Sequence, residues 1–157
     1  MKPEFLFVPG CVCVGLNAVS KKQLLQEMAD MAVSCGAAAN LKGRDVVSAV
    51  MERERLGSTG VGYGVAIPHA RLEGLDKVRA VFARLETPLE YDSIDDRPVD
   101  LVALLLAPAN AGGDHLKALA QISRLLRRED MRARLRSAPN SESLHLLLTE
   151  DRSVSVA

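Results

Sequence analysis

The sequence predicts an α/β domain, on two observations. Segments with helical spacing alternate with short apolar segments typical of strands, so that helices come before, between and after the strands. Hydrophobic residues make up 48% of the 157 residues, which is enough to bury a single sizeable core. No repeat, low-complexity tract or linker divides the chain. We therefore expect one domain over residues 1–157, with its core from about 14 to 150.

The first elements are a strand and a helix. Residues 1–17, "MKPEFLFVPGCVCVGLN", are apolar enough for a strand, and Glu4 and Pro9 interrupt the stretch too early for the core of a signal peptide. Ser20 opens the capping box "SKKQ", and apolar residues follow it at helical spacing. Gly36 can end this helix.

The middle of the chain predicts a second helix and three strands. The helix runs from about Arg44 to Arg55, and Gly57 ends it. The segment "TPLEYDSIDDRPVD" predicts a loop. Apart from Asp100, the segment at 99–107 is continuously apolar, which is typical of a strand buried on both faces. The predicted strands are Gly64–Ile67, Val78–Leu85 and Val99–Ala107.

The remainder of the chain predicts two helices. Asp114 can cap the first of them, and "PNS" at residues 139–141 separates it from a short helix at Glu142–Leu148. The apolar residues on one side of the first helix are Leu116, Leu119, Ile122 and Leu126.

Charge excludes two classes of partner. Lysine and arginine together number 20, as do aspartate and glutamate, so there is no general attraction to nucleic acid or to an anionic membrane. The longest apolar run, Leu101–Ala109, is far shorter than the roughly 20 residues of a membrane-spanning helix, and we expect no membrane insertion. Acidic residues concentrate at 85–100 and basic residues at 117–136. These segments are either solvated faces or docking surfaces for charged partner proteins.

The three cysteines predict no disulfide framework, because their number is odd. Cys11 and Cys13 form a C-x-C pair, and the matching second half of a zinc site is missing. The pattern favours free thiols, buried or half-buried, in a reducing cytoplasm.

The stretch "GSTGVGYGVAIPHA", residues 57–70, concentrates glycine just upstream of a histidine. It is not a Walker loop, because no lysine lies between residues 43 and 76. It is not a dinucleotide fingerprint, since the third glycine is missing and a strand rather than a helix follows. Two interpretations remain: a tight connection whose glycines supply positive φ, or a frame that presents His69 as a nucleophile.

The neighbours of His69 favour the second interpretation. Pro68 fixes the direction in which the chain leaves the strand, and Arg53 lies in the last turn of the preceding helix. A neutral imidazole beside a guanidinium suits phosphoryl transfer, in which the protein positions the group and stabilises charge on its oxygens. His115 lies at a predicted helix start, where the dipole favours an anion. His145, in "SLHLLL", indicates a surface or core-edge residue.

A zinc site is the alternative for the same histidines. It would combine His69, His115 and a cysteine, although no ligand pair has metal-site spacing.

Four stretches carry a resemblance to a known family. "RERLGSTGVGYGVAIPHARL" resembles the active-site signature of the type-2 enzyme IIA domains of the bacterial phosphoenolpyruvate-dependent phosphotransferase system. "SKKQLLQEMA", "DRPVDLVALLLAP" and "DHLKALAQISRLL" are similar to the nitrogen-related branch of that family. The resemblance spans most of the chain and implies a mixed central β-sheet flanked by helices on both sides.

The resemblance assigns roles to residues. It implies that His69 is phosphorylated on Nε2, that Arg53 stabilises the transferring phosphoryl group, and that His115 hydrogen-bonds or orients that group. Two neighbours of His69 depart from the family: Ala70 stands where glycine is frequent, and Tyr63 stands where we expect a smaller or more polar side chain. The residues expected to line the phosphoryl pocket are Ser58, Thr59, Gly60 and Gly62.

The resemblance also implies a function and partners, and it implies no metal or organic cofactor. The donor would be a small phosphocarrier protein of the HPr type, itself charged from phosphoenolpyruvate by enzyme I. The phosphorylation state would then control target proteins such as transporters or sensor kinases. Two alternatives stay open: a sugar-specific enzyme IIA that passes the group to a IIB domain of a fructose- or mannitol-type permease, and a binding module without phosphotransfer. The cytoplasm is the expected location, and the oligomeric state stays open.

Overall fold

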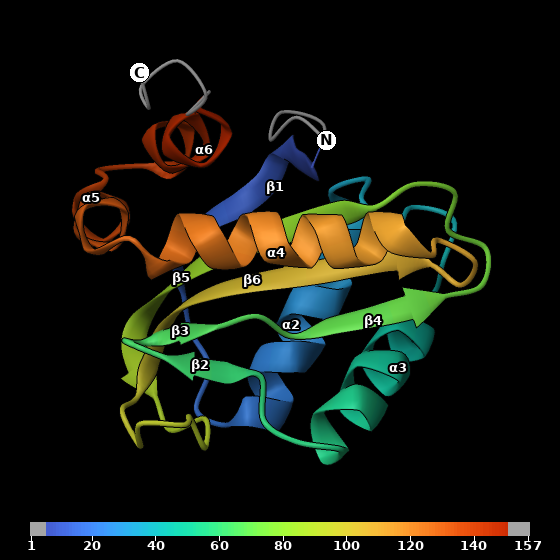
Figure 1. Ribbon diagram of the computed structural model, residues 1–157, viewed down its shortest axis with the longest axis horizontal. Helices are drawn as coiled ribbons and strands as arrows, with labels where there is room; N and C mark the ends of the chain where they lie inside the picture. The colour runs from blue at the N-terminus through green and yellow to red at the C-terminus, as the bar shows by residue number, and fades with distance from the viewer. Residues whose placement is uncertain (1–5, 151–157) are drawn as a thin grey trace.

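The computed structural model describes residues 6–150. They form a β-sheet with helices packed on both of its faces (Figure 1). The elements in chain order are β1 (Phe7–Leu16), α2 (Lys21–Ser34), α3 (Gly43–Arg55), β2 (Gly60–Gly62), β3 (Val65–Ala66), β4 (His69–Leu72), β5 (Arg79–Leu89), β6 (Val99–Pro108), α4 (Gly113–Arg127), α5 (Glu129–Ser137) and α6 (Ser141–Thr149).

Within the described residues, six strands form one mixed sheet. The order is β1-β5-β6-β3-β2, and β4 also pairs with β6. β5 and β6 are antiparallel, whereas β3 and β4 run parallel to β6 and β1 runs parallel to β5. β6 is buried along its length except at Asp100, as its continuous apolar sequence predicts. The expected α/β class and mixed sheet are confirmed.

Each face of the sheet has its own apolar core. α2 and α3 cover one face, where Val81 and Ala83 of β5 pack against them. α4, α5 and α6 cover the other (Figure 1). Ala80 and Phe82 of β5 belong to the core on that face. Successive side chains of a strand alternate between faces, so β5 supplies both cores.

The strand that carries the candidate nucleophile is interrupted. β3 and β4 both pair with β6, and Ile67 and Pro68 lie between them. Pro68 has no N–H to donate, but its carbonyl accepts from the backbone N–H of Leu105 at 2.9 Å. His69 is therefore the first residue of β4, not the last residue before a loop.

The first half of the chain matches its predicted helices. Ser20 caps α2, its Oγ accepting from the backbone N–H of Gln23 at 3.1 Å, and Gly36 follows the helix end with φ +99°. α3 begins one residue before the prediction, at Gly43, and ends at Arg55.

The expected cap of α4 is wrong, and its expected apolar face is confirmed at Ile122 and Leu126 but wrong at Leu116. Gly112, not Asp114, is the N-cap, and no side chain caps this end. The buried stripe runs through His115, Ala118, Ile122 and Leu126, while Leu116 is 63% exposed. A search for apolar residues alone does not count a histidine, so the first inward position of the helix was assigned to Leu116 instead of His115.

One strand is longer than predicted, and three elements were not predicted. β5 continues to Leu89, four residues beyond the prediction, and β2, β4 and α5 were not expected as separate elements. α5 is rich in arginine and buries only Met131, Arg132 and Leu135, so its apolar periodicity is weak.

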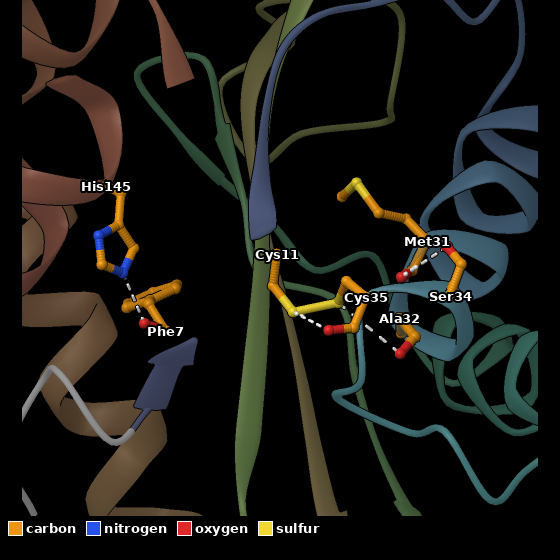
Figure 2. Close-up of a disulfide and its surroundings, with 7 residues drawn as sticks. All are labelled: Phe7, Cys11, Met31, Ala32, Ser34, Cys35 and His145. Atoms are coloured by element: carbon orange, nitrogen blue, oxygen red, sulfur yellow. Dashed lines mark hydrogen bonds between the residues drawn. A yellow bond between two sulfur atoms is a disulfide. The ribbon is translucent and has the colours of Figure 1, made fainter. Parts of the chain in front are cut away.

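The interpretation of free thiols is wrong for two of the three cysteines. Cys11 of β1 and Cys35 after α2 form a disulfide (Figure 2). Cys13 is a half-buried free thiol. The fold brings the Cα atoms within 5.3 Å across a sequence separation of 24, which spacing alone does not reveal. Figure 2 also shows His145 at the edge of β1, where its Nε2 donates to the carbonyl of Phe7 at 2.9 Å.

Candidate active site

The backbone next to His69 selects its tautomer. The Nδ1 of His69 lies 2.9 Å from the carbonyl oxygen of Ile67. A carbonyl oxygen only accepts, so Nδ1 carries the proton. Nε2 is left with an in-plane lone pair and is the nucleophilic nitrogen of the ring.

His69 is also held neutral. Burial lowers the pKa of His69 below its ordinary value, and the positive charge of Arg53 lowers it further. The Ile67 carbonyl and the Glu54 carboxylate act in the opposite direction without reversing the shift. The half-buried ring is therefore an uncharged nucleophile at neutral pH.

A second histidine faces the first. The ring centroids of His69 and His115 are 5.5 Å apart, with the planes inclined by 67°. His115 is buried in the first turn of α4, and its Nδ1 accepts from the Nε–H of Arg71 at 3.0 Å. Its Nε2 has no hydrogen-bond partner among residues 6–150. Burial, then the charges of His69 and Arg71, lower the pKa of His115, so this ring is neutral too.

Strand alternation explains why these groups meet. Ala70 and Leu72 of β4 point into the core under α2 and α3. His69 and Arg71 therefore point to the opposite face, where α4 presents His115. Arg71 was missed from the sequence, although its position two residues after His69 on a strand was the signal that could have found it. Ala70 faces away from the histidine pair.

A buried carboxylate organises the other side of the site. Glu54 accepts four hydrogen bonds: from Lys21 Nζ at 2.9 Å, from the Thr59 backbone N–H at 3.0 Å, from the Tyr91 hydroxyl at 3.0 Å and from the Thr59 hydroxyl. Burial alone would raise the pKa of Glu54, but the hydrogen bonds from Thr59 and Lys21 outweigh it and lower the pKa. Burial and the negative charge of Glu54 raise the pKa of Tyr91. The hydrogen bonds from Thr59 to Glu54 hold the glycine loop against the end of α3.

Arg53 precedes this carboxylate in the last turn of α3. Its Nη1 donates to the carbonyl oxygen of Gly57 at 2.9 Å, so the loop folds back onto the helix end. Its charge lies close enough to His69 to lower the pKa of that ring. The structure thus brings together Arg53, His69 and His115, which the sequence singled out from three distant segments.

The expected pocket-lining residues hold the loop against residues 91–93. The Ser58 hydroxyl donates to the carbonyl oxygen of Tyr91 at 3.2 Å, and Thr59 is buried with its hydroxyl bonded inward to Glu54. A Cβ on Gly60 would lie 2.5 Å from the Ser93 hydroxyl, so only glycine fits there. Gly62 has φ +101°.

Tyr63 lies at the outer rim of the loop. It has φ +58°, and its side chain is 57% exposed. The guanidinium of Arg132 lies 4.5 Å from the centre of its ring. Its carbonyl oxygen accepts from Arg136 Nη2 at 2.6 Å. Tyr63 therefore joins the glycine loop to α5.

No metal ligand set is found in the part of the chain that the structure describes, where no group of three or more His, Cys, Asp or Glu side chains could hold an ion. The zinc alternative thus has no ligand set there.

None of the helices within residues 6–150 is long and apolar enough to cross a membrane.

Comparisons with known proteins identify the family of this chain. The family model described as "Phosphoenolpyruvate-dependent sugar phosphotransferase system, EIIA 2" matches residues 5–151. A nitrogen regulatory protein of Bradyrhizobium diazoefficiens is 47% identical over 146 residues, which cover 91% of this chain and 92% of that protein. A fructose-specific EIIA component of Haloferax volcanii is 36% identical and covers 83% of this chain and 84% of its own length.

A solved structure extends the likeness to the whole fold. The crystal structure of nitrogen regulatory protein IIA-Ntr from Neisseria meningitidis superposes with a TM-score of 0.85 at 32% identity, covering 92% of this chain and 97% of that one. With the family model matched over almost its full length, this chain belongs to the type-2 enzyme IIA family of the phosphoenolpyruvate-dependent sugar phosphotransferase system.

Proposed function

We propose that this chain is a regulatory phosphocarrier of the nitrogen-related branch, which accepts a phosphoryl group on Nε2 of His69 from an HPr-like carrier protein. The observation that carries the proposal is the orientation of His69: its Nδ1–H is bonded to the Ile67 carbonyl, which leaves Nε2 as a neutral nucleophile beside Arg53 and His115. The location that fits this role is the cytoplasm.

The proposed step needs no cofactor. The lone pair of His69 Nε2 forms a bond to phosphorus while the bond between phosphorus and the donor breaks, and that electron pair leaves with the donor atom. The positive charge that develops on the ring is stabilised by the Ile67 carbonyl at Nδ1. The negative charge on the phosphoryl oxygens is stabilised by the Arg53 guanidinium and by the Nε2–H of His115.

Two neutral histidines suit this division of work. His69 supplies a lone pair, and His115 supplies an N–H that has no other partner within residues 6–150. Ser58, Thr59, Gly60 and Gly62 contribute through the shape of the loop, since the hydroxyls of Ser58 and Thr59 already bond within the protein. Phosphorylation would add negative charge at this surface, and partner proteins would respond to that change.

The relatives support the regulatory branch first and a sugar-specific role second. The 47% identical relative is named a nitrogen regulatory protein, whereas the fructose-specific component is 36% identical. In the second candidate function, His69 would pass its phosphoryl group to a IIB domain. Acceptance at His69 is common to both, and only the acceptor distinguishes them.

The test is a phosphotransfer assay read by intact mass. It contains phosphoenolpyruvate, enzyme I, the HPr-like carrier and this protein, with His69→Ala, Arg53→Ala and, as a matched histidine control outside the site, His145→Gln. We expect an acid-labile gain of one phosphoryl group on the wild type and on His145→Gln, none on His69→Ala, and slower labelling of Arg53→Ala. An unlabelled wild type, with a carrier that phosphorylates another enzyme IIA, would overturn the proposal in favour of a binding module.

A second reaction separates the two functions. The phosphorylated protein is mixed with purified IIB domains of the fructose and mannitol types. Retention of the phosphoryl group supports the regulatory role, and rapid transfer to a IIB domain supports the sugar-specific one.

A further inference from the structure

We infer that Arg71 is a positioning residue of this site: its Nε–H holds His115 in the tautomer that presents Nε2–H to the phosphoryl group. The consequence for phosphotransfer rests on the proposed function, whereas the tautomer is a property of the unphosphorylated protein.

The hydrogen bond itself leaves little freedom. Arg71 Nε lies 3.0 Å from His115 Nδ1. A guanidinium has only donors, so Nδ1 must accept and cannot carry a proton. The proton of the neutral His115 ring is then on Nε2.

The free end of His115 points to a ligand. Nε2 is buried and has no hydrogen-bond partner among residues 6–150, although a buried N–H without a partner costs free energy. The same ring lies edge-on to His69, 5.5 Å between centroids. A phosphoryl oxygen on His69 Nε2 would supply the missing acceptor.

The fold gives Arg71 this task through register. Arg71 pairs with Ala107 and His69 with Leu105 on β6, so the two side chains stand two residues apart on one face of β4. Ala107 and Leu105 belong to the core beneath α4, the helix whose first turn carries His115. One strand therefore carries both the nucleophile and the group that orients its neighbour.

Loss of Arg71 would change what His115 offers. With no donor at Nδ1, the ring can move its proton to Nδ1 and present a lone pair at Nε2. A lone pair repels phosphoryl oxygens, whereas an N–H attracts them. Arg71 also opposes a second proton on His115, because Nδ1–H would then face another donor.

The decisive experiment is nitrogen-15 NMR of the histidine rings in the unphosphorylated protein. In the wild type we expect His115 with a protonated Nε2 and an unprotonated Nδ1. Arg71→Met, which removes the donors and keeps an aliphatic chain, should populate the other tautomer. Arg71→Lys keeps a cationic donor and should retain the wild-type tautomer. Arg124→Met removes an exposed cation farther along α4 and is the matched control.

Phosphotransfer gives the second readout. The rate at which Arg71→Met accepts the phosphoryl group should be at least about 10-fold lower than that of the wild type. Arg124→Met should accept the group at the wild-type rate. A wild-type His115 that carries its proton on Nδ1, or a tautomer unchanged in Arg71→Met, would overturn the inference. A wild-type proton on Nδ1 overturns the inference whether or not Arg71→Met folds, and Arg71→Lys tests the need for a cationic donor. A wild type with the expected tautomer that takes no phosphoryl group refutes the proposed function and leaves the positioning role of Arg71 standing.

Discussion

The two walls of the site differ in how their polar groups are satisfied. The wall at α3, which we call the framework wall, consists of Lys21, Glu54, Thr59 and Tyr91, and its carboxylate accepts four hydrogen bonds. The wall at α4, which we call the donor wall, consists of Arg71 and His115 and leaves one buried nitrogen without a partner among residues 6–150.

The framework wall is thus suited to shape the site, and the donor wall is suited to bind an anion. A carboxylate with four donors can take part in chemistry only by losing one of them, so the framework wall is suited to fix the loop. A buried N–H without an acceptor gains a hydrogen bond when an anion arrives. Substitutions in the framework wall should therefore act mainly on stability, and those in the donor wall mainly on phosphotransfer.

The largest effect is expected from Glu54→Ala. It leaves the Thr59 N–H and the Tyr91 hydroxyl without their buried acceptor and should lower the free energy of unfolding by about 4 kcal/mol, measured by chemical denaturation. Glu52→Ala, at an exposed position of the same helix, is the control and should unfold like the wild type. Equal stability of the two variants would mean that the framework wall does not support the fold.

The disulfide supports the same wall from a distance. It ties the end of α2 to β1, and α2 carries Lys21. Reduction, or Cys11→Ser with Cys35→Ser, should lower the free energy of unfolding by about 3 kcal/mol, because the closed loop restricts the unfolded chain.

Denaturation with and without a reductant measures this effect. Cys13→Ser lacks only the free thiol and should respond to the reductant as the wild type does. Identical curves for oxidised and reduced protein would show that the disulfide does not stabilise the fold.

The donor wall should respond in the opposite way. His115→Ala removes the N–H that faces the phosphoryl group and should slow phosphoryl acceptance about 100-fold, measured as the initial rate of mass gain. Its free energy of unfolding should fall by less than that of Glu54→Ala, because His115 makes one hydrogen bond and Glu54 makes four. Gln121→Ala on the same helix should keep the rate. A His115→Ala protein that is unstable yet transfers normally would invert the comparison.

The smallest effect is the pH dependence of His69. Its pKa is lower in the folded protein than its ordinary value of 6.5, so the unfolded chain takes up the proton first. The contribution of His69 to stability is therefore complete above pH 6.5 and is lost as the pH falls from there through the folded pKa. The titration midpoint of the His69 ring, followed by NMR, should lie below 6.5. A midpoint at or above 6.5 would contradict this.

Local sequence signals predicted the helices and strands better than they predicted the contacts between distant side chains. Ser20 capped its helix and the apolar run of β6 formed a buried strand, because both depend on neighbours in sequence. The roles expected of Arg53, His69 and His115 stay predictions, although the fold brings these residues together.

Several of the missed contacts join distant segments. Glu54 and Tyr91 are 37 residues apart, and Cys11 and Cys35 are 24 apart, so no local pattern links them. The error at Leu116 has a different origin: His115, a polar residue, occupies the inward position of the helix, against the rule that apolar side chains mark the buried face.

The break between β3 and β4 decides the regiochemistry of the proposed product. Ile67 and Pro68 lie in this break, Pro68 has no N–H to donate, and the carbonyl of Ile67 faces Nδ1 of the His69 imidazole. Histidine forms two phosphoramidate isomers, and only the one with phosphorus on Nε2 is compatible with an Nδ1 that is already bonded. A gap between two short strands would thus act as the selector between two chemical products.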